Sequence, residues 1–433
     1  MLIAGEASGD LLAAELVEAL RPALAEFEGR PTTDSQPLHA SLAPKFFGAG
    51  GPRMAAAGVE LAFDLTQHSV IGLREALKNY VKLRRLLNQL RRLARERQPD
   101  AIICVDYSGF NRRLAHAIKK DVRARRNVFF NWNPTLIQYV SPQVWASRPG
   151  RADKMARDID LLLAMFPFEK EWYAKRVPHL RVEFVGHPII DRYARGTRAT
   201  DLPGRNAAGD RDLAVEAACD RPGEGKPAVI DRRYNLEWAA AEHSPMVILL
   251  PGSRVAELTR HLPVMLGALR AIRSAKPAVR ARMVLPTESL LQQAKQFAGN
   301  SERLEIQSGG LAEALSQATV AIASTGTVTM ECAYFGVPTV ALYKTSWDTY
   351  QIGKRIIRVK FLAMPNLLAN EPLFPEFIQH EANAENISRA ALELLGDEPR
   401  RNRIKARLTE IIASIGGPGA SARAAAAIVG LLR

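Results

Sequence analysis

The chain has 433 residues, 47% of them hydrophobic, which is enough for two domains that each bury a core. Its 59 Lys and Arg residues outnumber its 45 Asp and Glu residues, and the formal charge of +14 favours phosphorylated small molecules or anionic lipid. Three widely separated cysteines argue against a disulfide framework and a structural zinc site, and they indicate a reducing cytoplasm. We find no zinc-finger spacing or RNA-binding signature, so we expect no nucleic-acid partner.

The chain opens as a strand end followed by a turn, Leu-Ile-Ala and then Gly-Glu-Ala-Ser-Gly-Asp, which is not the pattern of a signal peptide. No apolar run approaches the roughly 20 residues of a transmembrane helix. We therefore expect any membrane contact to be peripheral.

Short apolar runs alternate with helical patterns, which predicts an α/β fold of two Rossmann-like domains with parallel sheets. The runs are 2–4, 101–105, 159–166, 182–185, 246–250, 281–285, 320–323 and 339–342. Residues 196–244 are rich in Gly, Pro, Arg and Asp, which predicts a linker with an insertion. The predicted domains are 1–195 and 245–411, facing a central cleft, with a closing helix at about 412–433 that can pack back on the first domain.

The first candidate site is the turn from Gly5 to Asp10. Its glycines allow a tight turn and the close approach of a ligand. Ser8 is placed to cap the following helix and is also a candidate contact to the acceptor. Glu6 has no obvious structural task there, which makes it a candidate for catalysis. The spacing differs from the dinucleotide fingerprint, so NAD is not indicated, and an ordinary strand–helix turn is the alternative.

The segment from Ser69 to Leu90 has apolar residues at helical spacing and Lys or Arg at most other positions. An amphipathic helix with a basic face can lie on anionic lipid. The positions that we assign to lipid contact are Val70, Leu73, Leu77 and Tyr80. The same spacing also fits a stripe packed into the core, and periodicity alone favours that alternative.

Three further positions follow apolar runs in the first half. Asp106 ends the run 101–105, where a carboxylate can accept a proton from a substrate hydroxyl or cap a helix beginning near Ser108. Gln143 and Trp145 can shape and hydrogen-bond the rim of an acceptor pocket, although Trp145 fits core packing equally well. His187 precedes a proline in a turn, where it can bind phosphate, bridge the domains or serve the turn itself.

The second half begins with a turn that can hold a diphosphate. Gly252 and Ser253 offer backbone N–H groups, and Arg254 offers a guanidinium fork. With a helix starting near Glu257, this arrangement predicts an anion cradle. A turn with a solvated arginine is the alternative.

A second turn in this half has the more specific pattern. Ser324, Thr325, Gly326 and Thr327 precede a helix whose N-terminus can bind an anion, and Glu331 lies one turn further on, where it can accept hydrogen bonds from a ribose. The pattern predicts a nucleotide-sugar site. Asn366, in a Met-Pro-Asn-Leu-Leu-Ala loop, is a further candidate contact to substrate or nucleotide.

Taken together, these residues resemble the lipid-A-disaccharide synthases. The resemblance rests on an ordered set of motifs that covers most of residues 1–381 and leaves 196–244 unmatched. The motifs are GEASGD, FFGAGGPRM, VDYSGFN, YVSPQVWA, FPFEKEWY, VGHP, LLPGSR, STGTVTMECAYFGVP and MPNLLA.

The resemblance implies a GT-B fold and an inverting glycosyl transfer that needs neither metal nor cofactor. The implied donor is UDP-2,3-diacylglucosamine and the implied acceptor is 2,3-diacylglucosamine 1-phosphate (lipid X). The implied products are the β-1,6-linked lipid A disaccharide 1-phosphate and UDP.

By the same resemblance, Asp106 is the base on the acceptor 6-hydroxyl, Arg254 and the 324–327 turn stabilise the leaving diphosphate, and Glu331 holds the ribose. The segment 69–90 receives acyl chains at the cytoplasmic face of the inner membrane. The family's C-terminal helices can exchange between subunits, which allows a homodimer. The family often has a second acidic residue three places after the aspartate, where this chain has Gly109.

The residues leave two alternatives open. Another GT-B glycosyltransferase or a UDP-sugar epimerase shares the turn, helix and Glu of the nucleotide site. A non-catalytic, membrane-associated paralogue binds UDP or lipid without turnover.

Overall fold

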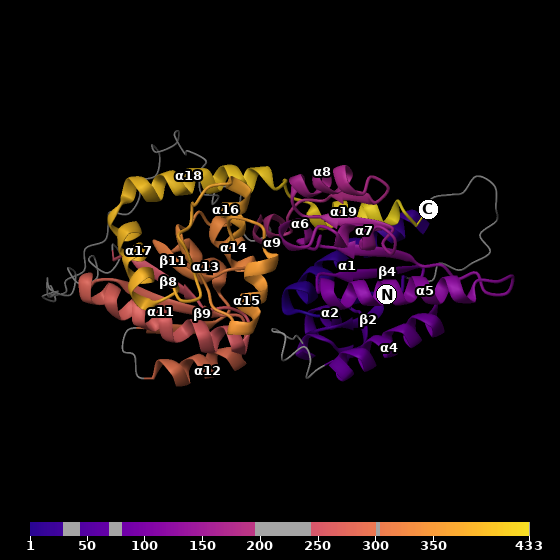
Figure 1. Cartoon of the computed structure of the whole chain (residues 1–433), viewed down its shortest axis with the longest axis horizontal. Helices are drawn as coiled ribbons and strands as arrows, with labels where there is room; N and C mark the ends of the chain where they lie inside the picture. Colours follow the sequence, from indigo (N-terminus) through magenta and orange to yellow (C-terminus); the bar gives the residue numbers. More distant parts are fainter. Residues whose placement is uncertain (29–43, 69–79, 195–243, 300–303, 433) are drawn as a thin grey trace, which may run out of the picture. The chain divides into compact units, whose positions relative to one another are not determined.

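The structure is a computed structural model, and it describes residues 1–28, 44–68, 80–194, 244–299 and 304–432. The chain divides into two compact units (Figure 1). Unit 1 comprises Met1–Arg195, Thr345–Lys360 and Glu410–Arg433, and unit 2 comprises Gly196–Lys344 and Phe361–Thr409. Each unit holds one parallel sheet, which confirms the predicted α/β class.

Unit 1 is built on a seven-stranded sheet with the order β3-β2-β1-β4-β5-β6-β7, in which every neighbouring pair is parallel. The strands are β1 (Leu2–Ala4), β2 (Phe47–Gly50), β3 (Glu60–Asp64), β4 (Ala101–Val105), β5 (Thr135–Tyr139), β6 (Leu161–Ala164) and β7 (Arg181–Phe184). Side chains alternate between the two faces, so Ile3 and Cys104 join one core cluster while Leu2 and Val105 join the other. Both faces are therefore apolar and need helices to cover them.

Helices pack on both of these faces (Figure 1). On one face α1 and α19 pack together, and on the other α4 and α5 pack together. The helices assigned to unit 1 are α1 (Ala7–Glu28), α2 (Pro52–Ala56), α4 (Tyr80–Arg97), α5 (Ser108–Arg125), α6 (Val144–Ser147), α7 (Arg151–Met155), α8 (Pro167–Arg176), α9 (Ile189–Ala194), α15 (Trp347–Ile356) and α19 (Ala420–Val429), with a 3-10 turn η1 (Thr66–His68).

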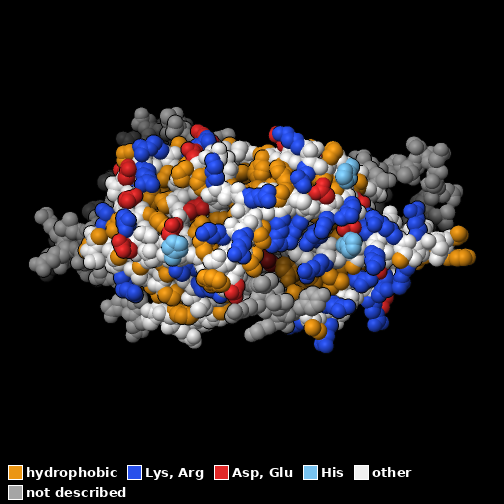
Figure 2. Space-filling view, viewed as in Figure 1, with side chains coloured by type: hydrophobic (Ala, Val, Ile, Leu, Met, Phe, Trp, Pro, Cys, Tyr) orange, Lys and Arg blue, Asp and Glu red, His pale blue; other side chains and the backbone are white. Residues whose placement is uncertain are grey.

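Helix α4 shows whether the apolar stripe of the amphipathic segment faces the core or the solvent. Its apolar residues Leu86, Leu90 and Ala94 lie in the core cluster between α4 and the sheet. Most of the described part of the stripe is therefore core, as the alternative interpretation held, whereas Val81 at its start is 59% exposed. The polar face of α4 is exposed, and Lys and Arg side chains gather over α4 and α5 (Figure 2). Val70, Leu73 and Leu77, together with the side chain of Tyr80, lie outside the described residues.

Unit 2 is built on a six-stranded parallel sheet with the order β10-β9-β8-β11-β12-β13. Its strands are β8 (Met246–Leu250), β9 (Arg280–Leu285), β10 (Leu304–Ser308), β11 (Val320–Ser324), β12 (Thr339–Tyr343) and β13 (Glu376–Ile378). Its helices are α11 (Val255–Ala275), α12 (Glu288–Ala298), α13 (Leu311–Ser316), α14 (Thr327–Tyr334), α16 (Met364–Ala369) and α17 (Ala384–Gly396). The boundary with unit 1 falls inside α18 (Glu398–Ser414).

The second domain is not continuous in sequence. The segment Thr345–Lys360, which we placed in the second domain, groups with unit 1, where the Arg358 N–H donates to the carbonyl oxygen of Ala146 (2.9 Å). The closing helix α19 packs on α1 in unit 1. No helix among the described residues has the length and apolar character needed to span a membrane.

Candidate active site

The backbone at the carboxyl ends of β4 and β5 is strained. Asp106 and Tyr107 have φ angles of 47° and 41°, and Val140 has a φ of 70°. These values lie in the left-handed region, where a β-branched residue such as Val140 is a marked outlier. Each such residue costs about 1–3 kcal/mol, and such strain concentrates at functional sites. Because Val105 pairs with Tyr139, the strained residues end two neighbouring strands at the same edge.

Two buried side-chain amides hold this strained backbone. Nδ2 of Asn111, in α5, donates to the carbonyl oxygens of Asp106 (2.9 Å), Val105 (3.2 Å) and Ile3 (3.5 Å). Asn111 has no exposed surface, so these bonds form away from water and fix the turn in one conformation.

The second amide belongs to Gln138 in β5, which is also buried. Its Nε2 donates to the carbonyl oxygens of Tyr139 and Val140, both at 3.2 Å, and more weakly to that of Asp106 at 3.4 Å. We call Asn111 and Gln138 the amide clamp. The clamp joins the ends of three adjacent strands, β1, β4 and β5.

The turn after β1 lies beside Asp106, as the predicted topology requires. Ala4 pairs with Val105, and a Cβ built on Gly9 would lie 3.5 Å from Cβ of Asp106. The ring of Tyr107 covers Gly5 so closely that a Cβ there would lie 2.1 Å from its Cδ1. The turn that carries Glu6 and the turn that carries Asp106 are thus packed together.

Helix α1 begins at Ala7, so Ser8 lies within its first turn and is not the N-cap that we predicted. The buried carboxylate of Asp10 instead organises this region, by accepting backbone N–H groups from Gly51 (2.7 Å), Arg53 (3.0 Å) and Met54 (3.1 Å). The sequence does not reveal this role, because the partners lie more than 40 residues away along the chain.

Asp106 itself is half-buried at the carboxyl edge of the sheet. Its alternative role was to cap helix α5, but the residue at the N-cap position of α5 is Tyr107. A carboxylate on a fixed turn at this edge is suited to accept a proton from a bound hydroxyl group. Gly109 is exposed in the first turn of α5, and a Cβ there would meet no atom within 4 Å.

In unit 2, the two predicted phosphate turns end adjacent strands. Leu250 pairs with Ala323, so the turn after β8 and the turn after β11 leave the same edge of the sheet side by side. The N-terminus of α14 is open: Gly326 is its N-cap with a φ of 130°, no side chain caps it, and Thr327 is exposed. Free N–H groups and the helix dipole favour an anion at this point.

The other predicted phosphate contacts differ in accessibility. Ser324 is buried, and Thr325 is partly buried and donates its N–H to the carbonyl oxygen of Leu342 (3.0 Å). Glu331 is partly buried one turn into α14, as the pattern predicted. The exposed part of this turn is therefore Gly326 and Thr327.

The turn after β8 is organised around a carboxylate. Helix α11 begins at Val255, close to the predicted start near Glu257, and Arg254 is its N-cap. The carboxylate of Glu257 accepts the N–H of Ser253 (2.9 Å) and lies 3.4 Å from Nη1 of Arg254. Gly252 has a φ of 126°, and a Cβ on it would lie 2.3 Å from Oε2 of Glu257. The Glu257 carboxylate thus binds the groups that we assigned to a phosphate.

His261 connects this turn to the end of β12, a role that sequence analysis missed. It is fully buried on α11, with Nδ1 2.7 Å from the carbonyl oxygen of Pro251, and its Nε2 accepts the N–H of Lys344 (3.0 Å). These contacts require a neutral ring with the proton on Nδ1, and burial lowers the pKa of His261 accordingly. In the sequence, this buried role is indicated by a lone histidine among the apolar residues of a helix.

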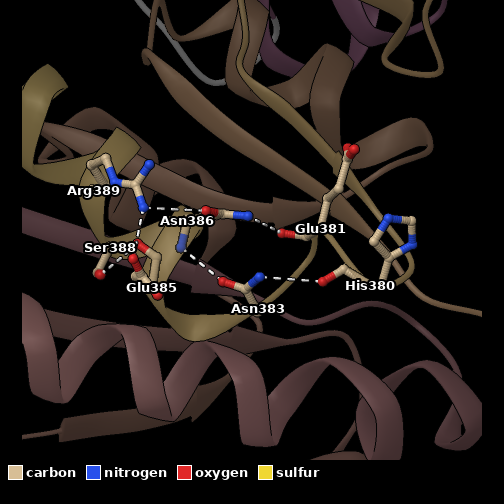
Figure 3. Close-up of polar contacts among 7 residues, drawn as sticks. All are labelled: His380, Glu381, Asn383, Glu385, Asn386, Ser388 and Arg389. Carbon is tan, nitrogen blue, oxygen red and sulfur yellow. Dashed lines mark hydrogen bonds and ion pairs between the residues drawn. The ribbon is translucent and has the colours of Figure 1, made fainter.

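A further turn at this edge, between β13 and α17, is also fixed by side chains (Figure 3). Nζ of Lys344 donates to the carbonyl oxygens of Gln379 (2.9 Å) and Ala382 (3.0 Å). Asn383 caps α17 and donates to the carbonyl oxygen of His380 (3.2 Å). The side chains of His380 and Glu381 point away from this network, so the turn presents them at the carboxyl edge (Figure 3).

The chain matches the family model described as lipid-A-disaccharide synthetase over residues 1–202 and 231–428. The chain belongs to the lipid-A-disaccharide synthase family. It is 34% identical over 437 residues to the lipid-A-disaccharide synthase of Geobacter metallireducens, with 100% of this chain and 97% of the relative covered. It is 30% identical to that of Coxiella burnetii, with 94% and 92% covered. The protein is accordingly a glycosyltransferase of lipid A biosynthesis.

Solved structures agree on the fold. A structure entitled S. aureus MnaA-UDP co-structure superposes with a TM-score of 0.57 at 13% identity, covering 100% of this chain and 96% of that one. The glycotransferase of kitacinnamycin gives 0.53 at 16% identity, with 97% and 95% covered. These likenesses place the lipid-A-disaccharide synthase fold with GT-B glycosyltransferases and epimerases.

Among the residues predicted to contact acceptor, Gln143 is exposed at the start of α6. Trp145 is half-buried, and its Nε1 donates to the carboxylate of Glu169 (3.1 Å). Glu169 also accepts the N–H of Phe166 (3.2 Å), and burial raises the pKa of its carboxyl to about 7. The motif FPFEKEWY contains Glu169, but the sequence alone does not indicate its burial or its bond to Trp145.

His187 has a structural environment. It is buried against Phe166, its ring Nδ1 accepts the backbone N–H of Ile189 (3.2 Å), and its backbone N–H donates to the carbonyl oxygen of Ile415 (3.1 Å). Burial lowers the pKa of His187 to about 3, so the ring is neutral and does not attract phosphate by charge. The geometry favours the structural alternative.

Asn366 is likewise used inside the protein. It has no exposed surface, its Nδ2 donates to the carbonyl oxygen of Phe374 (2.8 Å) and to Glu376 (2.7 Å), and its Oδ1 accepts the N–H of Phe374 (2.8 Å). The amide is enclosed and already bonded, which favours a role in fixing this loop over a direct contact with substrate or nucleotide.

The described residues contain no group of three or more His, Cys, Asp or Glu side chains arranged to hold a metal ion. Asp158 and Asp160, which form an Asp-x-Asp sequence before β6, are each paired with a base: Asp158 with His116 (3.0 Å) and Asp160 with Lys119 (2.8 Å). We assign them to the structure of unit 1.

Proposed function

We propose that this glycosyltransferase condenses UDP-2,3-diacylglucosamine with 2,3-diacylglucosamine 1-phosphate (lipid X). The products are the β-1,6-linked disaccharide 1-phosphate and UDP. The observation that carries the proposal is Asp106, a carboxylate fixed on a strained and clamped turn at the carboxyl edge of unit 1, in a member of this family.

In the proposed mechanism, Asp106 takes the proton from the 6-hydroxyl of the acceptor. The oxygen then forms a bond to C1 of the donor sugar while the bond from C1 to the UDP oxygen breaks. One displacement inverts the configuration, and positive charge develops on the sugar ring as in glycoside hydrolysis. The fixed turn supports this role because a base held in place spends little free energy on reorientation.

Glu6 occupies the neighbouring turn and is partly buried. We propose that its carboxylate acts beside Asp106 on the acceptor, as a second acidic group supplied from β1. This arrangement gives the site two acidic groups although position 109 is a glycine. Gln143 and Trp145 remain proposed contacts to the acceptor.

The leaving diphosphate is proposed to bind in unit 2, at the open N-terminus of α14 and the turn from Gly252 to Arg254. Binding there requires the Glu257 carboxylate to release the Ser253 N–H and the Arg254 guanidinium. The helix N-terminus and Arg254 then supply the electrostatic stabilisation, so we propose a reaction without a metal ion or cofactor. Glu331 is proposed to bind the ribose hydroxyls.

Because both proposed substrates carry acyl chains, we propose that the enzyme works peripherally at the cytoplasmic face of the inner membrane. The exposed Lys and Arg side chains of α4 and α5 support contact with anionic lipid (Figure 2). The predicted acyl-chain contacts at Val70, Leu73 and Leu77 stay predictions.

The test is UDP release from UDP-2,3-diacylglucosamine in mixed micelles with EDTA, with and without lipid X. We expect release that depends on lipid X and a disaccharide product of the corresponding mass. Release without acceptor would indicate hydrolysis or epimerase-like chemistry instead. Loss of turnover in EDTA would refute the metal-independent mechanism. UDP binding without release would indicate the inactive paralogue.

A further inference from the structure

The chain makes a tight hairpin turn directly after α5, from Asn127 to Phe130. The two residues bond to each other in both directions, with N–H to carbonyl distances of 3.1 and 3.2 Å. The side chain of Asn127 also accepts the N–H of Phe129 (2.8 Å). At the tip, Val128 is 95% exposed and Phe129 is 98% exposed.

The base of this turn is fixed in the core. Phe130 and Trp132 pack edge to face with ring centroids 6.4 Å apart; Trp132 belongs to the core cluster between α5 and the sheet, and Phe130 is partly buried against it. Nε1 of Trp132 donates to the carbonyl oxygen of Pro99 (3.0 Å). The two apolar side chains at the tip are therefore held out by a rigid support. Single exposed apolar residues are common, but two adjacent ones on a fixed tip indicate a contact surface.

The surface around the tip is strongly basic. Arg123, Arg125 and Arg126 precede it and are exposed, and in the described part of the chain Arg125 and Arg126 form no ion pair. The nearest acidic residue in sequence, Asp121, is already bound to Arg91 (2.6 Å). Figure 2 shows Lys and Arg over this face and hydrophobic atoms projecting where the chain leaves α5. An apolar tip with a basic collar matches the interface of an anionic bilayer.

We propose that this turn inserts Val128 and Phe129 into the interfacial layer of an anionic membrane while Arg123, Arg125 and Arg126 bind the lipid headgroups. Helix α5 leads away from the carboxyl edge over 18 residues, about 27 Å, so the tip lies at the opposite edge from Asp106. The turn anchors unit 1 without touching the reacting atoms. Its purpose rests on the proposed function, because an anchor of this kind serves substrates that reside in the membrane.

The test uses the full chain and co-sedimentation with vesicles of phosphatidylcholine alone or with phosphatidylglycerol at 3:1. The double variant Val128→Ser and Phe129→Ser should bind the anionic vesicles about tenfold more weakly than the wild type, because two apolar side chains no longer leave water. Phe297→Ser is the matched control, because Phe297 is 49% exposed on α12 in unit 2. Arg125→Glu with Arg126→Glu should weaken binding and reduce its salt dependence.

A probe on the tip reports insertion directly. Cys104 and Cys332 are buried, so a Phe129→Cys variant with Cys219→Ser can be labelled at one site with an environment-sensitive fluorophore. Its emission should shift to the blue on anionic vesicles, whereas the same label in a Phe297→Cys variant should not shift. Equal vesicle binding by the wild type and the Val128/Phe129 double variant would overturn the proposal. So would a tip-dependent dimer on size-exclusion chromatography that binds no vesicles.

Vesicle binding and disaccharide formation are separate readouts, so a failure of the anchor can be distinguished from a failure of the proposed reaction. If the tip variant binds vesicles poorly but keeps wild-type turnover with detergent-dispersed substrates and loses it with vesicle-borne ones, both proposals hold. If the wild type binds vesicles through the tip but makes no disaccharide, the anchor stands and the proposed reaction fails.

Discussion

Replacing Glu169 with Gln should remove a pH-dependent loss of stability from unit 1. Glu169 is 2% exposed, and burial raises the pKa of its carboxyl from 4.5 to about 7. A raised folded-state pKa favours the protonated form, so the contribution to stability is complete below pH 4.5 and is lost as the pH rises through 7. A pKa raised from 4.5 to about 7 corresponds to roughly 3 kcal/mol of unfolding free energy.

The Glu169→Gln side chain is neutral at every pH, and its oxygen can still accept the indole N–H of Trp145. We therefore expect urea unfolding of the wild type to weaken by about 3 kcal/mol between pH 4.5 and pH 8.5, while the variant loses far less. Glu171→Gln is the control, because Glu171 is exposed on the same helix.

A second readout separates this carboxyl from every other titrating group. The indole N–H resonance of Trp145, assigned with a Trp145→Phe variant, should titrate with a midpoint near 7 in the wild type and stay constant in Glu169→Gln. Parallel pH profiles of stability for the two proteins, together with a Trp145 resonance that does not move, would refute the raised pKa of Glu169.

Three further predictions concern the two half-sites. Gly5→Ala should lower kcat more than tenfold, because the added Cβ displaces the Tyr107 ring beside Asp106. Gly9→Ala is the control: its Cβ meets ordinary contacts of 3.4 Å or more, so this variant should keep most activity in the same assay. Asn111→Ala should cost about 2–3 kcal/mol of stability on urea unfolding. It should also lower kcat but leave the Kd for UDP unchanged, because the clamp acts in unit 1. Equal losses in kcat and in UDP affinity would contradict this expectation. Glu257→Gln should bind UDP several-fold more tightly by calorimetry, because a neutral side chain competes less with phosphate for Ser253 and Arg254; weaker binding would show that Glu257 supports the site.

The sequence predicted the fold well because the strands of a parallel sheet are continuous apolar runs. Runs such as 101–105 and 246–250 became β4 and β8 with the same bounds. The positions of Asp106 and Gly326 followed from the rule that ligands bind beyond the carboxyl ends of such strands.

What the sequence did not reveal depends on partners that are distant along the chain. Asn366 has the residue type of a ligand contact, but its amide binds the backbone of Phe374, which only the folded loop shows. In the sequence, Glu169 resembles a solvated helix residue, and only the structure shows that it is buried and bonded to Trp145. The amphipathic spacing of α4 was ambiguous because core and membrane both select the same apolar stripe.

The most direct test of the account is the rate of lipid A disaccharide formation by Asp106→Asn at saturating UDP-2,3-diacylglucosamine and lipid X, with Asp153→Asn as an exposed control in the same unit. We predict a rate about 10²–10⁴-fold below the wild type, with UDP binding and the melting temperature preserved. Formation of the disaccharide by Asp106→Asn at the rate of the wild type and of Asp153→Asn would contradict the assignment of the catalytic base.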